Sequence, residues 1–381
     1  MKTKKKKSSL EHSKLEKIYL GSALTKGQKD KKKSLLSRPV KAVNPLRADS
    51  IVGLLDSYKD MSIQARLLGQ CASVYQNMLR DKTRPTVFLG LAGPLIAGGL
   101  RKTIRDMVAY GIVDVIVSTG AILYQDLYQA LGHKHYIGSP NANDSILRKL
   151  LINRIYDTYV DDEKFVKTDS WVGRFADTLE PRSYSSREFL ALLCSQIKDS
   201  ESILKTASKY GVPVFSPALN DSSIGIGLTD HYHINKTLKQ GKITIDSIRD
   251  NYELTQIMVK SPKTAAVYIA GGVPKNFIND SVVMGYIFGK NTGGHSYAFQ
   301  LTTDSPHWGG LSGSTLEEAK SWGKVSGKAS KAMAFVEPTV SLPLVVGYVL
   351  QKGLWKGRRR LKFSWDSDIL KRLETGGIVS A

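Results

Sequence analysis

Three residues close together in the sequence have the types needed for chemistry on a charged amine: Glu318, Trp322 and Lys324. Thr315 precedes Glu318 by three residues, the spacing of a capping box, which predicts that a short helix begins there. Glu318 and Trp322 would then share one face of that helix, because they are four residues apart. Gly323 favours an end to the helix, which would place Lys324 at its mouth.

Such a trio suits a cationic amine as substrate. A carboxylate pairs with an ammonium group, an indole offers its face to a cation, and a partly desolvated lysine can act as a Schiff-base nucleophile. A lysine does so only as the neutral amine, which burial or a neighbouring cation favours. The same residues are also compatible with an exposed lysine after a helix end, with Trp322 only packing, so these residues alone leave both interpretations open.

Four histidines occur as two His-x-His pairs, His133 with His135 and His231 with His233. A metal site needs three or four ligands held in a fixed geometry, and no Cys, His or Glu at a matching spacing completes either pair. We therefore expect no metal and interpret these side chains as solvated loop histidines.

The charge of the chain is concentrated near its N-terminus. The 381 residues carry a formal net charge of +21; residues 1–48 hold fifteen Lys or Arg and three Asp or Glu, so they contribute +12 and residues 49–381 contribute +9. Runs such as Lys4–Lys7 stay solvated, which predicts a flexible, solubilising tail. Docking of the tail on an acidic partner or on RNA is the alternative. Tyr19 is the single aromatic residue of the tail, which argues against specific nucleic-acid recognition.

The small number of cysteines and the shortness of the apolar runs predict the cellular compartment. Its two cysteines, Cys71 and Cys194, are far apart, which fits a reducing compartment. The longest apolar runs are too short to cross a bilayer. We expect a cytoplasmic protein with no membrane partner.

Short apolar strands dominate the sequence after an initial helical region. Two helices are expected between Asp49 and Arg80, where apolar residues recur at helical spacing. The expected strands that follow are 87–89, 113–117, 212–215, 265–269 and 296–302. We expect a turn at 90–94, a helix at 95–110 and a loop at 216–227.

A strand, turn, helix and strand in succession form a βαβ unit, which requires parallel strands. We therefore predict an α/β fold with an open, mostly parallel Rossmann-like sheet flanked by helices, preceded by a disordered or helical N-terminal extension. Residues 49–381 are expected to form one catalytic domain and residues 1–48 a basic tail, because no linker or repeat divides the chain further. Ligands of such sheets bind beyond the carboxyl ends of the strands.

Several motifs occur in one uninterrupted order. They are Ser321-Trp322-Gly323-Lys324 after Glu318, the run Phe215-Ser216-Pro217-Ala218-Leu219-Asn220-Asp221, Val113-Asp114-Val115 leading to Thr119-Gly120, and Gly271-Gly272-Val273-Pro274-Lys275. Together they resemble the deoxyhypusine synthase family over about residues 85–350.

The resemblance implies an NAD-binding domain and a specific reaction. Bound NAD would take a hydride from spermidine, a lysine would capture the butylamine fragment as an imine, and 1,3-diaminopropane would leave. The fragment would pass to one lysine of the hypusine-bearing translation factor, and the hydride would return. The resemblance also implies a homotetramer with active sites between subunits.

The family's site residues map onto this chain position by position. By resemblance, Lys324 is the imine-forming lysine, and Glu318, Trp322, Gly271 and Asn276 line the amine site. The positions that match the family's NAD contacts are Gly93, Pro94, Leu95, Ile96, Ala97, Thr119, Gly120, Ala121, Gln125, Asp221, Thr303, Asp304, Glu337 and Pro338.

Some positions depart from the family pattern, and the departures concern the amine site. Tyr124 and Gln125 replace two adjacent Glu, Ile226 and Leu311 each replace an Asp, and Asn276 replaces a His. Removing the carboxylate partner of a buried cation costs roughly 3–5 kcal/mol, so the donor and the acceptor stay open.

Three carboxylates could replace the missing ones, namely Asp126, Asp230 and Asp304. The sequence between Gly309 and Gly313 is more similar to a divergent, deoxyhypusine-synthase-like prokaryotic branch. A homospermidine-synthase-type transfer to a free diamine and a catalytically silent NAD-binding protein are the remaining alternatives.

Overall fold

Six parallel strands form the central sheet of the protein, in the order β11-β10-β9-β1-β2-β7. The chain starts in the middle at β1, builds outward through β2 to β7, and then returns to the other side of β1. This order is that of a doubly wound dinucleotide-binding sheet, so the predicted Rossmann-like fold is confirmed. The strands are β1 (Thr86–Leu91), β2 (Val115–Ser118), β7 (Val214–Phe215), β9 (Thr264–Ile269), β10 (His295–Leu301) and β11 (Val325–Ala334).

The computed structural model describes residues 24–46 and 48–379 and divides the chain into two units, Met1–Ala42 and Val43–Ala381. In the first unit, helix α2 (Lys26–Leu35) begins with a complete capping box between Thr25 and Gln28 and buries no side chain. Half of the predicted tail, residues 1–23 and 47, lies outside the described residues, and Tyr19 is among them. The sheet and the helices that cover its two faces belong to the second unit.

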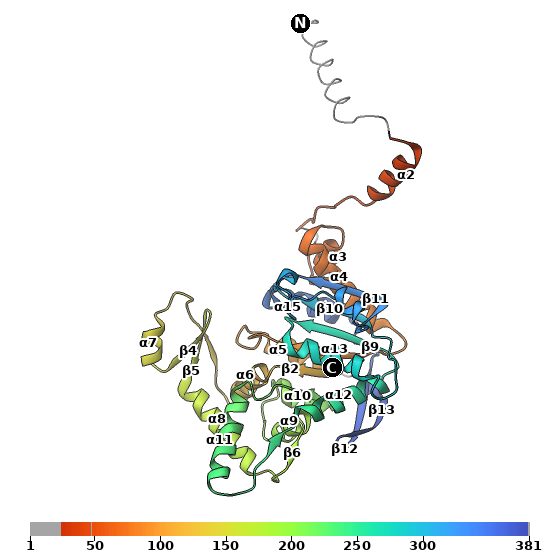
Figure 1. The fold of residues 1–381 in the computed structure, drawn as a ribbon. Helices are drawn as coiled ribbons and strands as arrows, with labels where there is room; N and C mark the ends of the chain where they lie inside the picture. The colour runs from red at the N-terminus through yellow and green to blue at the C-terminus, as the bar shows by residue number, and fades with distance from the viewer. Residues whose placement is uncertain (1–23, 47, 380–381) are drawn as a thin grey trace, which may run out of the picture. The chain divides into compact units, whose positions relative to one another are not determined.

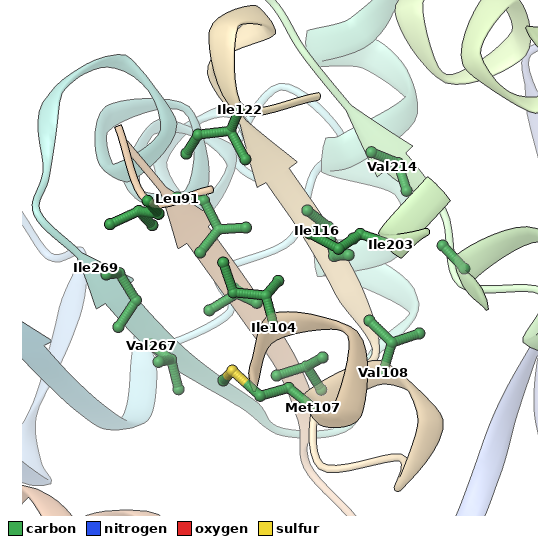
Figure 2. Close-up of a cluster of buried hydrophobic side chains, with 14 of the residues drawn as sticks. Leu91, Ile104, Met107, Val108, Ile116, Ile122, Ile203, Val214, Val267 and Ile269 are labelled. Atoms are coloured by element: carbon green, nitrogen blue, oxygen red, sulfur yellow. The ribbon is translucent and has the colours of Figure 1, made fainter. Parts of the chain in front are cut away.

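Apolar side chains cover both faces of the sheet, because successive residues of a strand point to opposite sides. In β1, Leu89 and Leu91 belong to one buried cluster and Phe88 to the other. Figure 2 shows the first cluster, in which α5 (Arg101–Ala109) lays Ile104 and Met107 over the strands. A sheet buried on both faces explains why its strands read as continuous apolar runs in the sequence.

The helices divide between these two faces. Those contributing to the first cluster are α3 (Ile51–Tyr58), α4 (Ile63–Arg80), α5, α6 (Gly120–Ala130), α8 (Asp162–Asp177), α9 (Ser186–Cys194), α10 (Ile203–Tyr210), α11 (Ser223–Thr237) and α15 (Pro338–Gln351). Those contributing to the second are α12 (Ser247–Lys260), α13 (Gly272–Met284) and α14 (Glu318–Ser321). The two helices expected between Asp49 and Arg80 are therefore present as α3 and α4.

An arm projects from the side of the sheet near α6 (Figure 1). Its small antiparallel sheet has the order β3-β5-β4, and α8 packs against α11 beside it. The arm consists of β3 (His135–Ile137), α7 (Asp144–Lys149), β4 (Ile152–Ile155), β5 (Thr158–Asp161), α8 (Asp162–Asp177) and α11 (Ser223–Thr237). The remaining elements are the strand pair β6 (Ser183–Tyr184) and β8 (Thr244–Ile245), the turn η1 (Pro306–Trp308), and the hairpin β12 (Arg359–Asp366) and β13 (Ile369–Ile378).

The first strand and the first helix differ from their predicted bounds. Strand β1 continues through Gly90, whose missing side chain lets Ile278 and Tyr268 pack close, so the turn begins only at Ala92. The helix expected from Leu95 starts instead at Arg101. Gly99 has a φ of +86°, which interrupts the helical backbone before that point.

The loop expected at 216–227 is shorter than predicted. Helix α11 begins at Ser223, because the hydroxyl of Ser222 accepts a hydrogen bond from Gly225 N and caps the helix. The prediction of solvated loop histidines is wrong for His231, which is buried on α11. Its ring bonds to Asp177 and accepts from Ile243 N, so it has a packing role.

Buried charges tie α9 and α12 to the C-terminal hairpin. The fully buried carboxylate of Glu253 accepts from Arg187 Nε at 2.6 Å and from Arg249 Nε at 2.9 Å. Arg187 also donates to Ser367 O in the turn between β12 and β13. Beside this network, Asp250 Oδ1 accepts from the backbone N and hydroxyl of Ser186, and burial raises the pKa of Asp250 to about 7.

We expect the stability of the protein to fall between about pH 4 and pH 7 because of Asp250. The pKa in the folded state lies above the unfolded value of about 3.9, so the folded state retains a proton that the unfolded state has lost. The resulting stability is complete below the unfolded pKa and is lost as pH rises through the folded pKa. Asp250→Asn mimics the protonated acid, so urea unfolding should show it gaining up to roughly 4 kcal/mol on the wild type over this range.

The exposed Glu374→Gln is the matched control and should follow the wild type at each pH. A difference between wild type and Asp250→Asn that does not change with pH would contradict the assignment.

Candidate active site

Loops that follow the six strands lie together at one edge of the sheet, because the strands are parallel. The chain passes from β1 to α5 on one face and from β9 to α13 on the other, so the two loops diverge at the centre of the sheet. A crevice at such a switch point is the usual ligand site of this architecture. All the residues predicted to contact NAD lie in these loops or in the first two turns of the helices that follow.

The first and last predicted cofactor segments line one cavity of about 360 Å³. Pro94, Leu95 and Ala97 come from the loop after β1, and Glu337 comes from the loop after β11. The turn between β4 and β5, at 155–158, lines it as well. The two segments are far apart in the sequence, so their convergence is a product of the fold. Ile96, by contrast, is buried in the core.

The cavity wall is held by two local contacts. Ala97 N donates to Gln125 Oε1 at 3.1 Å, which connects the first cofactor loop to α6. Glu337 Oε2 accepts from Thr339 N at 2.8 Å, so this carboxylate caps α15, whose first residue is Pro338. Both contacts fix the loop backbones in place.

Helix α6 begins directly after β2, with Thr119 as its N-cap and no side-chain hydrogen bond at the cap. Gly120 packs against the loop before α11, where a side chain would approach Ser222 Oγ to 2.4 Å. Ala121 and Asp221 are exposed at this junction. The helix start and the Asp221 loop therefore form one surface with polar groups facing outward.

The loop between β10 and β11 crosses over α13 from one end to the other. It begins at the carboxyl edge with the exposed Thr303 and the half-buried Asp304. It ends at Lys324, immediately before β11, whose amino end lies at the opposite edge. We call residues 302–324 the crossover loop.

The buried side chain of Gln300 and the close approach of Gly271 fix the crossover loop to the strand ends. Gln300 Nε2 donates to Ala270 O at 2.6 Å and to Ser312 O at 2.7 Å. Gly271 lies so close to this loop that a Cβ atom there would come within 2.5 Å of Ser312 Cα. The predicted amine-site glycine is therefore a position of close backbone approach.

Lys275 is the third attachment and was missed from the sequence. Its ammonium is almost fully buried and donates to Leu311 O, Ser314 O and Ser314 Oγ at 3.2, 2.6 and 2.9 Å. Burial lowers the pKa of Lys275 to about 8, and the nearby cation of Lys324 acts in the same direction. The carboxylate of Glu318 opposes this shift.

Lys324 is joined to a carboxylate that was not predicted. Its Nζ lies 2.9 Å from Asp280 Oδ1 and 5.4 Å from the centre of the Trp322 ring. Asn276, one turn earlier on α13, donates to the other oxygen of Asp280 at 2.8 Å. The Lys324 side chain is 16 % exposed and the indole is 70 % exposed, so a lysine beneath an open aromatic face is aligned by a fixed acid.

Glu318, which is predicted to line the amine site, makes no ion pair with Lys324 among the described residues. Thr315 and Glu318 do form a reciprocal capping box: Thr315 N donates to Glu318 Oε2, and Glu318 N donates to Thr315 Oγ1. Helix α14 then lasts only four residues, and Gly323 has a φ of +68°. Among the described residues the ion pair of Lys324 is with Asp280, and Glu318 instead stabilises the start of the helix and lowers its own pKa by that contact.

Asp126 cannot replace a missing amine-site carboxylate. It is fully buried, and its oxygens accept from Arg101 Nε, the Ser202 hydroxyl and the backbone N atoms of Ile203 and Leu204. It holds the first turn of α10 in place.

Asp230 is exposed on α11, and the half-buried Asp304 lies in the crossover loop near Lys275.

Three altered positions have apolar or blocked side chains. Ile226 and Leu311 are 57 % and 38 % exposed, so they present apolar surface outward. Tyr124 is buried, and its hydroxyl donates to Phe165 O at 3.0 Å. None of the three offers an acceptor to a cation at these points.

A signal for Asp280 was present in the sequence. Gly272 begins α13 directly after a strand, and helical spacing from Asn276 reaches Asp280 one turn later. That pair shares a face at i and i+4. The contact with Lys324 depends on the course of the crossover loop, which no periodicity reveals.

In residues 24–46 and 48–379, no cluster of three or more His, Cys, Asp or Glu is arranged to hold a metal ion. No helix among these residues is long and apolar enough to cross a membrane.

The amino-acid sequence is similar to a known protein family and to several of its members. A family model described as deoxyhypusine synthase matches residues 53–349. The "Probable deoxyhypusine synthase 2" of Methanosarcina acetivorans is 42 % identical over 322 residues, which are 83 % of this chain and 91 % of that protein. The "Deoxyhypusine synthase-like protein" of Chlorobaculum parvum is 42 % identical over 339 residues, 87 % of this chain and 95 % of that protein.

A solved structure shares the fold. The crystal structure of a candidate deoxyhypusine synthase from Entamoeba histolytica superposes with a TM-score of 0.55, at 18 % identity. The superposition covers 82 % of this chain and 97 % of that chain.

Proposed function

This chain belongs to the deoxyhypusine synthase family, and from that premise we propose that it is an NAD-dependent transferase in which Lys324 carries an aminobutyl group. The observation that supports this most directly is the pairing of Lys324 with Asp280 at 2.9 Å beneath the exposed Trp322 ring. A largely shielded lysine, an acid and an open aromatic face are the parts that imine chemistry on a cationic amine needs.

The proposed reaction balances with the groups named. The carbon beside the secondary amine of spermidine loses a hydride, so that a C=N bond forms. The neutral Lys324 amine adds to this carbon, 1,3-diaminopropane leaves, and an imine joins Lys324 to the four-carbon amine. An acceptor amine then displaces Lys324, and the returning hydride reduces the new C=N bond. NAD, when bound, supplies the place where the hydride is held between the two steps.

Asp280 has a specific part in this scheme. A protonated imine on Lys324 carries its positive charge where the ammonium stood, so the carboxylate 2.9 Å away stabilises it by the same attraction. Asn276 keeps the carboxylate oriented through its hydrogen bond. We propose that this carboxylate compensates for part of the negative charge absent at Tyr124, Ile226 and Leu311.

The residues at the carboxyl edge fit a dinucleotide. The cavity of about 360 Å³ is bordered by Pro94, Ala97 and Glu337, and the start of α6 at Gly120 presents backbone N–H groups without a side-chain cap. A helix start of this kind binds phosphate, and the Glu337 and Asp221 carboxylates are acceptors suited to ribose hydroxyls. We propose that NAD binds along this edge.

The donor and acceptor are proposed from the family. We propose spermidine or a related polyamine as donor and a lysine of the hypusine-bearing translation factor as acceptor. The apolar surface of Ile226 and Leu311 favours the alternative of a small free amine, as in homospermidine synthesis, because it departs from the family's acidic amine site.

We also propose that the protein is a homotetramer with sites between subunits. The arm exposes large apolar side chains, including Ile137 at 99 % and Tyr156 at 72 %. Exposed apolar groups gathered on one element are typical of surfaces that another chain covers.

Borohydride reduction should trap the donor fragment on Lys324. With NAD and labelled spermidine, mass spectrometry of the wild type should show an aminobutyl adduct on the peptide containing Lys324, because reduction makes the imine permanent. Lys324→Ala should give no adduct, and the exposed Lys328→Ala should give as much as the wild type.

Asp280→Asn tests the role of the carboxylate in the same experiment. We expect the adduct to form about ten- to a hundredfold more slowly, which corresponds to about 1.4–2.8 kcal/mol, while Asp280→Glu should recover part of the rate. Equal labelling of wild type and Lys324→Ala would remove the central proposal and favour a silent NAD-binding protein.

A competition between acceptors should identify the acceptor class. Purified protein with NAD, labelled spermidine, putrescine and the translation factor should label the translation factor if the leading proposal holds. Label that appears only in homospermidine would establish the alternative and reject the protein acceptor.

Light scattering coupled to size exclusion tests the assembly. We expect the mass of four 42.0 kDa chains, and we expect Ile137→Asp, which places a charge on the exposed arm, to shift the population to smaller species. A monomeric wild type would contradict the tetramer without affecting the trapping result.

A further inference from the structure

A second concave surface lies at the amino edge of the sheet, where the segments before β1 and β12 meet. It encloses about 660 Å³ between the end of α4, the end of α15 and the C-terminal hairpin. Its lining is strongly basic, with a single acidic residue, Asp81. The basic residues of this basic pocket are Arg80, Lys82, Arg84, Lys352, Lys356, Arg358 and Arg359.

The floor of the basic pocket holds two guanidinium groups that share one carboxylate. Arg84 forms two hydrogen bonds with Asp114, at 2.6 and 2.8 Å, and Arg358 reaches the same carboxylate at 3.4 Å. The side chains of Arg358 and Asp114 are 2 % and 4 % exposed. Two positive charges against one negative charge leave an excess cation in a buried place, which is unfavourable without a further anion.

The pKa of Arg358 reflects this excess charge. Burial lowers it to about 10, in spite of the opposing attraction of Asp114. The neighbouring cation of Arg84 acts in the same direction as burial. Asp114 does not offset this lowering of the Arg358 pKa, because Arg84 holds both oxygens of the carboxylate at shorter distances.

The one acid in the lining does not neutralise the pocket. Asp81 pairs with Lys263 at 2.8 Å and accepts from Tyr297, so its charge is already balanced outside the basic pocket. Lys352 has its own partner in Asp56.

Four cations at the rim have no carboxylate within ion-pair distance in the part of the chain that the structure describes: Arg80, Lys82, Lys356 and Arg359. Arg80 is the last residue of α4, where the helix dipole stabilises a cation, so its charge is explained without a bound anion. Lys82, Lys356 and Arg359 lie outside helices, so no helix dipole stabilises their charges.

We propose that the basic pocket binds a compact anion carrying two or more phosphate groups. Guanidinium forks match phosphate oxygens, and four arginines together with Lys82 and Lys356 around one hollow provide charge for several groups. Gly353 and Gly357, with φ of +65° and +73°, leave backbone open to a close approach. The volume of about 660 Å³ is within the usual range for a small ligand.

The shape of the pocket favours a small polyphosphate over a nucleic-acid strand. None of its lining residues is aromatic, so it has no ring on which a base could stack. It is a concave surface whose lining shares no residue with the candidate active site. The inference therefore does not depend on the proposed reaction.

Calorimetric titration with inorganic tripolyphosphate tests the proposal. We expect saturable binding of one tripolyphosphate per chain, weakening as salt is raised because the contacts are ionic. The double variant Lys82→Glu/Lys356→Glu reverses two exposed rim charges and should bind at least about tenfold more weakly. The double variant Lys236→Glu/Lys260→Glu makes the same change of net charge on exposed positions elsewhere and should bind like the wild type.

Thermal unfolding of all three proteins without ligand establishes that the variants are folded. Absence of saturable binding to the wild type, or equal weakening in both double variants, would overturn the proposal. Displacement of tripolyphosphate by an unstructured RNA that binds more tightly at the same residues would also overturn it, in favour of a nucleic-acid surface.

Discussion

The candidate active site depends on how closely the crossover loop lies against the start of α13. Gly271 permits this approach because it has no side chain, and Gln300 and Lys275 hold the loop there by hydrogen bonds from below. If the loop stood a few ångströms higher, Lys324 would lose Asp280, which belongs to α13 and cannot follow. The ion pair between Lys324 on one segment and Asp280 on another thus rests on the close backbone contact between the crossover loop and Gly271.

The two edges of the parallel sheet carry different chemistry. The carboxyl edge has small, open loops with acceptors such as Asp221 and Glu337, while the amino edge holds Arg84 and Arg358 around a single acid. Parallel strands impose this separation, because every strand–helix loop lies at one edge and every helix–strand loop at the other. A ligand at one edge therefore has its own contacts and need not compete with a ligand at the other.

The sequence was sufficient for the fold class and for the positions of most strands, because buried apolar runs reveal a parallel sheet directly. Helix starts were less accurate: α5 begins at Arg101 because Gly99 adopts a positive φ, a conformation that composition suggests only in hindsight. The motifs singled out Lys324 as the candidate lysine, but they did not indicate its ion-pair partner. Asp280 is distant from Lys324 in sequence and meets it only through tertiary packing. Glu318 is close in sequence, but its carboxylate accepts a hydrogen bond from Thr315 N.

The three hydrogen bonds of the Lys275 ammonium have a consequence for how molecules move through the site. Lifting the crossover loop would leave this buried cation without acceptors, so opening of the loop is a costly and rare event. We expect amines to enter and leave past the exposed edge of Trp322, by rotation of a side chain on the nanosecond scale. The rate of turnover would then be limited by the chemical steps or by release of the product, and not by motion of the crossover loop.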